Sequence, residues 1–422
     1  MGYFPKKFKT AILKLIPKQK TDQTAPSNYR PISLLEVTGK TLEKIINRRL
    51  RKFLEANNKL PSTQHGFRSK RGTDTALTTI HETIAHYTAK RSQCYIVLRD
   101  VSKAFDKVWH NGLQFKIGLL NLPLTITKLL NNFLEDRIAK IKIGNYTGPA
   151  FPLLAGVPQG SSLSPTLYTI YTADLPPPAQ DCVNIQYADD ITQIITYPGK
   201  SRPLMANRIV REIEKINYYE KKWKIKTNKN KFKIIPMAVR NKANVVIDGT
   251  PLVLSNNGKV LGLKLGQTGI NGHIADLRIK GKKALTELQR FKNLPTKIKL
   301  HLVKAFILPI LQYPTIPLVT VSKSNFLKLQ TVQNNALRFA HNERYPYERN
   351  TETLHAISGI EPINYSLYTK AAKLYDKVTA LEDTSMENIQ DNYEENINHG
   401  WFRKARVTLD RGPPRRMFTT NR

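Results

Sequence analysis

The chain has 422 residues, of which 67 are lysine or arginine and 32 are acidic, so its formal net charge is +35. This charge excludes an ordinary neutral metabolic enzyme as the default and indicates a polyanionic partner, nucleic acid first of all. A hydrophobic fraction of 40% excludes a disordered basic tail. No apolar run is long enough to span a membrane, and two cysteines cannot build a disulfide framework.

The first half of the chain alternates between helical and strand patterns. Apolar residues at helical spacing predict a helix over 41–60 that Pro61 ends, and a second helix over 74–89. The apolar run at 95–98 predicts a short buried strand that leads to Asp100. Further helices are predicted over 113–122, 126–137 and 164–175.

Residues 183–196 (VNIQYADDITQIIT) carry the clearest hairpin pattern, in which two β-rich arms flank a polar turn with Asp189 and Asp190. A helix is predicted over 207–223, and helical patterns dominate after about residue 270. The predicted fold class is therefore α+β, with a mixed α/β part followed by a helical C-terminal region.

Three acidic residues stand out because of the elements that carry them. Asp100 ends an apolar strand, and Asp189 and Asp190 lie at the tip of the hairpin. Carboxylates at strand ends suit Mg²⁺, and two such ions about 3.5–4 Å apart can activate a hydroxyl and stabilise a leaving pyrophosphate. Adjacent acids in a hairpin are more often simple turn residues, so the pair alone leaves both interpretations open.

Seven sequence blocks surround these acids: NYRPISLL, QHGFR, LRDVSKAFDKVWH, AGVPQGSSLSPTLY, YADD, WKIKTNKNKF and VLGLKL. In these blocks and their order the chain resembles the reverse transcriptases of non-LTR (LINE-type) retrotransposons, most of all the jockey group of arthropod elements. The blocks run to about residue 266, roughly three fifths of the chain. The resemblance implies a right-hand polymerase with fingers, palm and thumb, and the activity of an RNA-directed DNA polymerase.

The resemblance also implies roles for single residues. Asp100, Asp189 and Asp190 match the catalytic acids that hold two Mg²⁺ ions, with Mn²⁺ as a possible substitute. Phe105 matches the aromatic residue that screens the 2′-hydroxyl of the nucleotide, since a bulky ring there rejects ribose by a clash. Without the resemblance, Phe105 would be interpreted as an ordinary core aromatic.

Five further residues are predicted to bind nucleotide or template. Gln159 and Gly160 lie in a Pro/Gly loop that, by the resemblance, packs against the template and the incoming nucleotide. Arg30 and Arg68 fall in finger-like blocks and are candidates for holding phosphates. Lys231 is a candidate proton donor to the departing pyrophosphate. A plain turn for the loop, and solvated charges for the three cations, are the alternatives.

The predicted domains follow the blocks. Residues 1–266 are expected to form the reverse transcriptase domain with fingers and palm, 267–380 a helical thumb or connection region, and 381–422 an acidic-then-basic tail of poor order. Basic residues in the helical region would hold the template–primer backbone, or form only the wet face of amphipathic helices. They are Lys280, Lys282, Lys283, Arg290 and Lys292.

The implied partners are an RNA template, a DNA primer and deoxynucleoside triphosphates, without a membrane and with the oligomeric state left open. An intracellular location is expected, and action in the nucleus would follow from target-primed copying. Full-length relatives carry an endonuclease domain ahead of the polymerase. The chain offers no residues for that nuclease, for a zinc knuckle or for RNase H, so we expect truncation at its N-terminus.

Arg99 is the main departure from the family pattern, which has an apolar residue immediately before the catalytic Asp. An unpaired guanidinium in a buried strand would be costly. Arg99 is therefore expected either at an exposed strand end or paired with an acid. The departure leaves an alternative function open, that of an inactive or domesticated copy that only binds nucleic acid.

Overall fold

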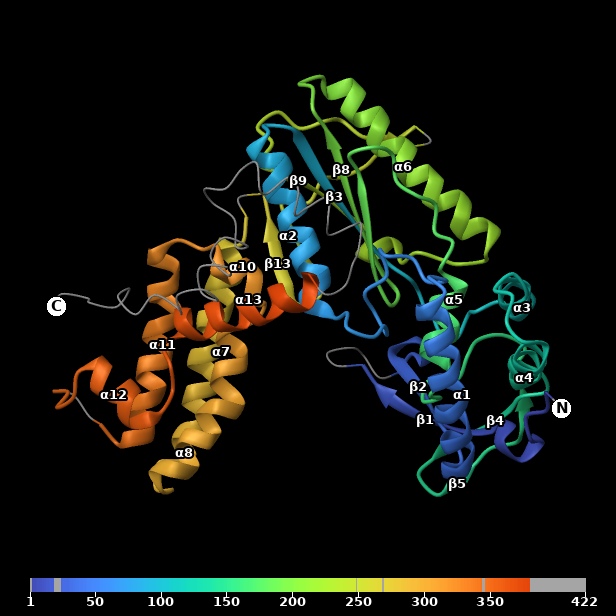
Figure 1. The fold of residues 1–422 in the computed structure, drawn as a ribbon, viewed down its shortest axis with the longest axis horizontal. Coiled ribbons are helices and arrows are strands. Elements are labelled where there is room, and N and C mark those ends of the chain that lie inside the picture. The colour runs from blue at the N-terminus through green and yellow to red at the C-terminus, as the bar shows by residue number, and fades with distance from the viewer. Residues whose placement is uncertain (1, 19–23, 248, 268, 344–345, 380–422) are drawn as a thin grey trace.

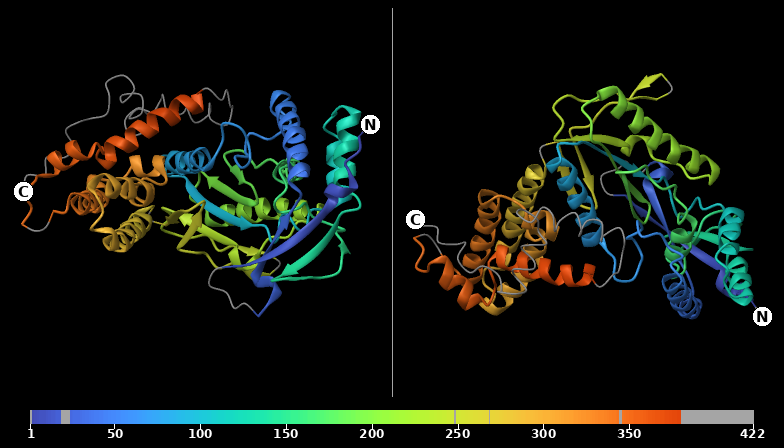
Figure 2. Two further views of the ribbon diagram at one scale, coloured as in Figure 1. Left: turned by 90° about the horizontal axis from the view of Figure 1, so that it is seen from below. Right: turned by 45° about the horizontal axis from the view of Figure 1, so that its top comes forward.

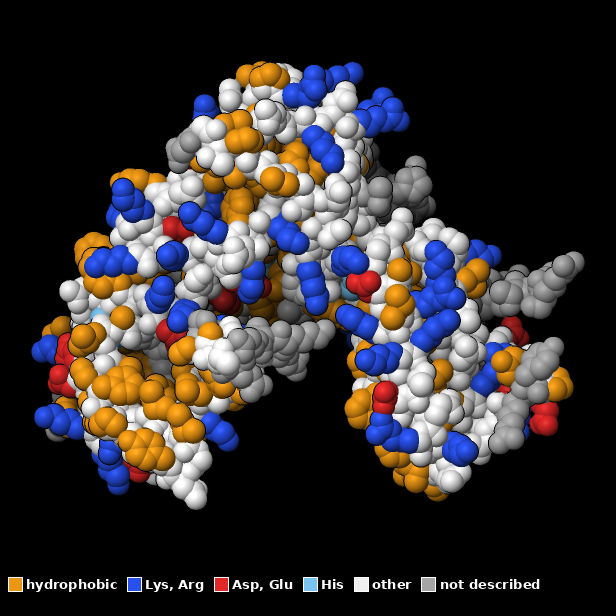
Figure 3. Space-filling view, turned by 180° about the vertical axis from the view of Figure 1, so that it is seen from behind, with side chains coloured by type: hydrophobic (Ala, Val, Ile, Leu, Met, Phe, Trp, Pro, Cys, Tyr) orange, Lys and Arg blue, Asp and Glu red, His pale blue; other side chains and the backbone are white. Residues whose placement is uncertain are grey.

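The computed structural model describes residues 2–18, 24–247, 249–267, 269–343 and 346–379. Figure 1 shows an arch in which an N-terminal lobe and a helical C-terminal lobe flank a central sheet. The two views of Figure 2 also place the two lobes on opposite sides of that sheet. The two lobes therefore meet the sheet from different directions, and the space-filling view of Figure 3 shows a hollow between them.

The central sheet has four antiparallel strands in the order β7 (Val183–Tyr187), β8 (Asp190–Tyr197), β3 (Gln93–Asp100) and β9 (Lys233–Met237). β3 is apolar along most of its length because helices cover both of its faces: Cys94 and Ile96 join the cluster beneath α2 (Thr73–Ala89), and Tyr95 and Val97 join the cluster beneath α6 (Arg202–Lys222). Alternate residues of β3 thus point to α2 and to α6.

The N-terminal lobe contains a second sheet and four helices. Helix α1 forms because Ile46, Leu50 and Leu54 recur every four residues and bury one face. The strands are β1 (Thr10–Pro17), β2 (Tyr29–Leu34), β4 (Ile138–Ile143), β5 (Tyr146–Thr147) and β6 (Phe151–Pro152). The helices are α1 (Val37–Ala56), α3 (His110–Gly118), α4 (Leu124–Leu134) and α5 (Ser164–Tyr171).

A buried lysine joins α3 to α5 and α6. The ammonium of Lys116 lies 3.7 Å from the ring centroid of Trp223 and donates to Asp174 and to the hydroxyl of Tyr219. Burial lowers the pKa of Lys116 to about 8, although Asp174 opposes the shift. The aromatic rings and one carboxylate therefore hold this cation between α3, α5 and α6.

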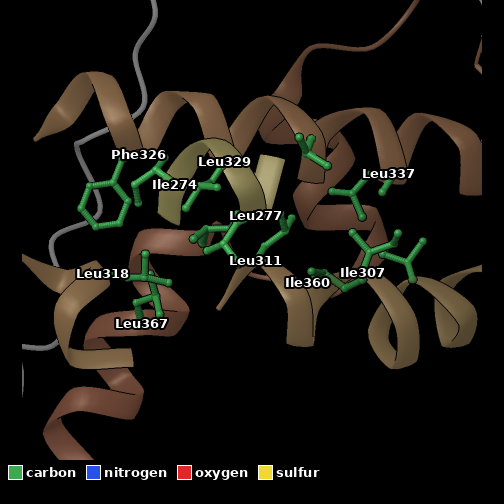
Figure 4. Close-up of a cluster of buried hydrophobic side chains, with 14 of the residues drawn as sticks. Ile274, Leu277, Ile307, Leu311, Leu318, Phe326, Leu329, Leu337, Ile360 and Leu367 are labelled. Carbon is green, nitrogen blue, oxygen red and sulfur yellow. The ribbon is translucent and has the colours of Figure 1, made fainter. Parts of the chain in front are cut away.

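The C-terminal lobe is a bundle around one apolar core, in which Leu277, Leu311, Leu329 and Leu337 converge (Figure 4). Its helices are α7 (Asn271–Leu288), α8 (Thr296–Leu302), α9 (Leu308–Leu311), α10 (Thr315–Val319), α11 (Lys323–His341), α12 (Thr351–Ser358) and α13 (Ile363–Thr379). Short strands precede it: β10 (Val246–Ile247), β11 (Thr250–Pro251), β12 (Asn257–Val260) and β13 (Leu263–Gly266). The lobe thus has a hydrophobic core of its own.

The α+β fold class predicted from the sequence is confirmed, and so are the hairpin at 183–196 and the helix at 74–89. The helix predicted over 41–60 spans Val37–Ala56 instead. It ends before residue 60 because Asn58 adopts a left-handed conformation (φ 49°) that no helix can continue. The predicted tail at 381–422 lies outside the described residues. Within the described part of the chain, no helix is long and apolar enough to cross a membrane.

Candidate active site

The three acidic residues lie at one end of the central sheet. Asp100 is paired with Asp190 across the β3–β8 ladder, and the pairing of Tyr187 with Asp190 closes a tight hairpin that leaves Asp189 in the turn. The side-chain amide oxygen of Gln64 accepts a hydrogen bond from the backbone of Ala188 and so fixes that turn. The sheet register thus brings Asp100 to the end of the sheet that carries the adjacent pair Asp189 and Asp190, far along the chain.

Burial, together with repulsion between neighbouring acids, raises the pKa of Asp190 and Asp189. Burial raises the pKa of Asp190 to about 6, and the charges of Asp189 and Asp100 add to the shift. Burial also raises the pKa of Asp189, and Asp100 adds to it while Lys231 and Arg30 oppose it. The site therefore holds an excess of half-buried negative charge that a cation would relieve.

Lys231 supplies one such cation. Its ammonium lies 2.9 Å from Oδ1 of Asp100, and the backbone N–H of Asn228 donates to the carbonyl of Asp100 over 2.8 Å. Among the described residues, no three His, Cys, Asp or Glu side chains already converge as a metal-binding group. The hard oxygen donors and their excess charge fit divalent ions.

A cavity of about 600 Å³ opens beside the acids, within the range of small-molecule sites. The N-terminal lobe contributes one wall through the β1–β2 strands, and the segment after β3 contributes the other. The structure brings most of the predicted residues to this cavity. They are Arg30, Asp100, Phe105, Gln159, Asp189 and Lys231.

Phe105 is held at this cavity by other aromatic rings. It stacks on Tyr168 with ring centroids 5.2 Å apart and meets Phe67 edge-on at 6.2 Å. Its carbonyl also accepts a hydrogen bond from the backbone of Val157 over 2.7 Å. The ring is therefore a fixed part of the wall.

The Pro/Gly loop joins the two walls. The backbone N–H of Ser33 in β2 donates to the carbonyl of Gln159 over 2.7 Å. Gly160 has φ +130°, and a Cβ there would lie 2.4 Å from the carbonyl oxygen of Ser33. Only glycine permits so close an approach. Gly160 therefore lets the loop pack closely against β2, and it is not among the residues that line the cavity.

Asp106 is a site residue that the sequence reasoning missed. It lines the cavity and accepts a hydrogen bond from the side chain of Gln159 over 2.8 Å. Burial raises its pKa, although Gln159 and Lys103 oppose the shift. Its place immediately after Phe105, in the block that also carries Asp100, was the available signal.

Arg68 lies away from this group. Its guanidinium donates to both carboxylate oxygens of Glu55 over 3.2 and 2.5 Å, and to the carbonyl of Pro61. The side chain is 8% exposed and lies outside the residues that line the cavity. The structure therefore gives Arg68 a bidentate structural ion pair.

Arg99 is buried, at 3% exposed, so the expectation of an exposed strand end is wrong. The other expectation is confirmed, because Glu220 of α6 lies 3.3 Å away. Burial lowers the pKa of Arg99, and Glu220 opposes the shift. Arg99 points to α6, on the face of β3 opposite to Asp100.

The chain is similar to several known proteins. A family model described as reverse transcriptase (RNA-dependent DNA polymerase) matches residues 16–265. The chain is 27% identical over 389 residues to the probable RNA-directed DNA polymerase from transposon X-element of Drosophila melanogaster, covering 90% of this chain and 42% of that protein. It is 28% identical over 354 residues to the RNA-directed DNA polymerase from mobile element jockey of the same species, covering 80% and 38%.

Among solved structures, apo telomerase from Candida tropicalis aligns with 92% of this chain and 68% of its own, at 13% identity and a TM-score of 0.47. Telomerase from Candida albicans, in complex with a telomeric RNA fragment, aligns with 93% of this chain and 63% of its own, at a TM-score of 0.45. The chain spans about two fifths of the length of the two Drosophila relatives.

Proposed function

The chain belongs to the reverse transcriptase (RNA-dependent DNA polymerase) family, and from this premise we propose that it copies an RNA template into DNA. Its resemblance to the enzymes of non-LTR retrotransposons, predicted from seven sequence blocks, is confirmed by the jockey and X-element relatives. The observation that carries the proposal is the set of three carboxylates beside a cavity that Phe105, Gln159 and Arg30 line.

In the proposed reaction, the 3′-hydroxyl of a primer attacks the α-phosphate of a deoxynucleoside triphosphate. A new bond forms between the 3′-oxygen and the α-phosphate, the bond between the α-phosphate and pyrophosphate breaks, and the hydroxyl proton passes to solvent water. Asp100, Asp189 and Asp190 would hold the divalent ions, Mg²⁺ in our proposal. When bound, these ions lower the pKa of the attacking hydroxyl and stabilise the charge on the leaving group.

Other residues of the cavity act on the nucleotide itself. Arg30 and Lys231 place positive charge at the cavity, where a triphosphate would bind. The Lys231 ammonium is also a proton source for the departing pyrophosphate. Phe105 would exclude a 2′-hydroxyl by contact, because its ring is packed against Tyr168 and cannot withdraw easily.

The lobes suit a template and primer. Figure 3 shows lysine and arginine side chains on both lobes and around the hollow between them. We propose that residues 1–266 form the fingers and palm, and that 267–380 act as the thumb. Lys280, Lys282 and Lys283 are exposed on α7, where they could contact a phosphate backbone. Copying of the RNA from a primer end at the chromosomal target would place this activity in the nucleus.

Primer extension on an RNA template with deoxynucleotides and Mg²⁺ tests the proposal. We expect extension by the native chain and at least about hundredfold slower extension by the Asp189→Asn, Asp190→Asn variant. Asp276→Asn, which changes an exposed acid paired with Lys264 outside the site, is the matched control and should extend normally. Nucleic-acid binding without extension by the native chain would overturn the proposal and favour the binding-only alternative.

A further inference from the structure

A buried cation lies directly behind the catalytic strand. The guanidinium of Arg99 donates to Gln193 of β8 over 3.2 Å, to Asn217 of α6 over 2.9 Å and to the carbonyl of Ile213 over 2.9 Å. With Glu220 as the counter-ion, all three nitrogens of the guanidinium have a partner. This arrangement joins β3 and β8 to α6 behind Asp100.

The same network reaches the segment 226–232, which carries Lys231. The hydroxyl of Thr227 donates to Oε1 of Glu220, the oxygen that also accepts from Arg99. At the other end of the segment, the guanidinium carbon of Arg99 lies 5.3 Å from the ring centroid of Phe232. Arg99 therefore holds the segment on both sides of Lys231.

Backbone contacts dock the segment onto the end of β3. Ser102 donates to the carbonyl of Lys226 and Asn228 donates to the carbonyl of Asp100, each over 2.8 Å. Val101 and Thr227 form an isolated β-bridge between them. The short 3₁₀ turn Lys229–Lys231 follows and presents the ammonium to Asp100.

Loss of Arg99 would act on this docking. Glu220 would become a buried carboxylate without its cation, which is costly unless water or another cation reaches it. Water that hydrates Glu220 would compete with Thr227, since the Thr227 hydroxyl donates to the same oxygen that Arg99 leaves. Release of the Thr227 hydroxyl would leave the segment held on β3 by the backbone contacts alone, and so would weaken the placement of Lys231 at the cavity.

We propose that Arg99 is a positioning residue, which acts through Glu220 and Phe232 to keep the ammonium of Lys231 at Asp100 and at the nucleotide cavity. The effect on turnover rests on the proposed polymerase function, whereas the effect on the segment 226–232 does not. On this proposal, the departure from the family pattern at Arg99 supports the site and does not impair it.

Hydrogen–deuterium exchange of the whole chain tests the structural half. In Arg99→Met we expect the amides of 226–232 to exchange about tenfold faster, in line with the loss of one hydrogen-bonded charge. Arg137→Met is the matched control: Arg137 is also buried, at 2% exposed, but donates to Phe133 in the N-terminal lobe. It should leave exchange in 226–232 unchanged. Equal exchange in the Arg99→Met and native chains would overturn the proposal.

A double-mutant cycle on single-nucleotide incorporation tests the catalytic half. Lys231→Met and Arg99→Met should each slow incorporation, and the double variant should be no slower than Lys231→Met alone. If the double variant is slower by the product of the two single-variant factors, Arg99 acts independently of Lys231. That result would refute the positioning role. If the native chain itself does not incorporate nucleotides, the proposed function fails, and the exchange experiment still decides the role of Arg99.

A second variant tests the proposal even if Arg99→Met fails to fold. Arg99→Met combined with Glu220→Met removes both buried charges together, which proteins often tolerate. We expect this variant to keep a native thermal midpoint while the segment 226–232 still exchanges about tenfold faster, because the contacts to Thr227 and Phe232 are lost. Native exchange in this variant would contradict the proposal.

Discussion

Replacement of Asp190 by asparagine is expected to stabilise the metal-free protein while it abolishes catalysis. The pKa of Asp190 is raised from 3.8 to about 6 by burial and by two neighbouring carboxylates. That shift corresponds to roughly 3 kcal/mol of unfavourable charge in the folded state. Because the side chain is partly exposed, solvent screening reduces the expected gain to about 1–2 kcal/mol. The active site would thus oppose folding until a cation binds.

The sign of the pH dependence follows from the direction of this shift. Between pH 3.8 and about 6 the folded state binds more protons than the unfolded state, so the Asp190 carboxyl lowers stability as the pH rises. Above pH 6 the full penalty is present, and below pH 3.8 it has vanished. The advantage of Asp190→Asn should therefore be complete at pH 8 and nearly absent at pH 4.

Urea unfolding in EDTA at both pH values measures this advantage. Added Mg²⁺ should then raise the stability of the native chain and leave that of Asp190→Asn nearly unchanged, since ions that bind only the folded state stabilise it. Asp276→Asn, at an exposed ion pair, should gain nothing at either pH. The reasoning is refuted if Asp190→Asn is no more stable than the native chain at pH 8 without metal.

Three further predictions concern other parts of the molecule. Gly160→Ala should cost about 1–3 kcal/mol in thermal unfolding and raise the KM for deoxynucleotide, because its φ is +130° and a Cβ would meet β2; Gly118→Ala, with open space around its Cβ, should leave KM unchanged. For Lys116, whose pKa falls from 10.5 to about 8, the unfolded state binds more protons over that range. Native stability should therefore rise with pH there, and urea midpoints of Lys116→Met should lack this rise. Arg68→Met should lower the thermal midpoint through loss of the Glu55 pair while KM for deoxynucleotide stays native; a raised KM would place Arg68 in nucleotide binding after all.

Local patterns predicted the elements that carry the three proposed catalytic acids. The apolar run before Asp100 and the alternating arms around Asp189 and Asp190 are properties of neighbouring residues, and β3, β7 and β8 form where those patterns lie. Placement of the three acids at one end of a sheet needed only the strand ends and the hairpin. This part of the site was therefore accessible from the sequence together with the family resemblance.

Partners that lie far apart in the chain could not be predicted in this way. Arg99 and Glu220 are 121 positions apart, and Asp106 and Gln159 are 53 apart. Their contacts depend on how α6 and the Pro/Gly loop pack, which periodicity does not encode. Arg68 looked available for phosphates because its acidic partner, Glu55, is separated from it by a turn of irregular backbone.

The alternating faces of β3 have a consequence for the insertion or deletion of a residue in this strand. Asp100 and Arg99 are neighbours that project to opposite sides of one strand, so a deletion or insertion of one codon within β3 exchanges their sides. A guanidinium would then stand among the acids, and a carboxylate would be buried against α6. A shift of one residue within the eight residues of β3 would therefore invert the charge at the proposed active site in one step.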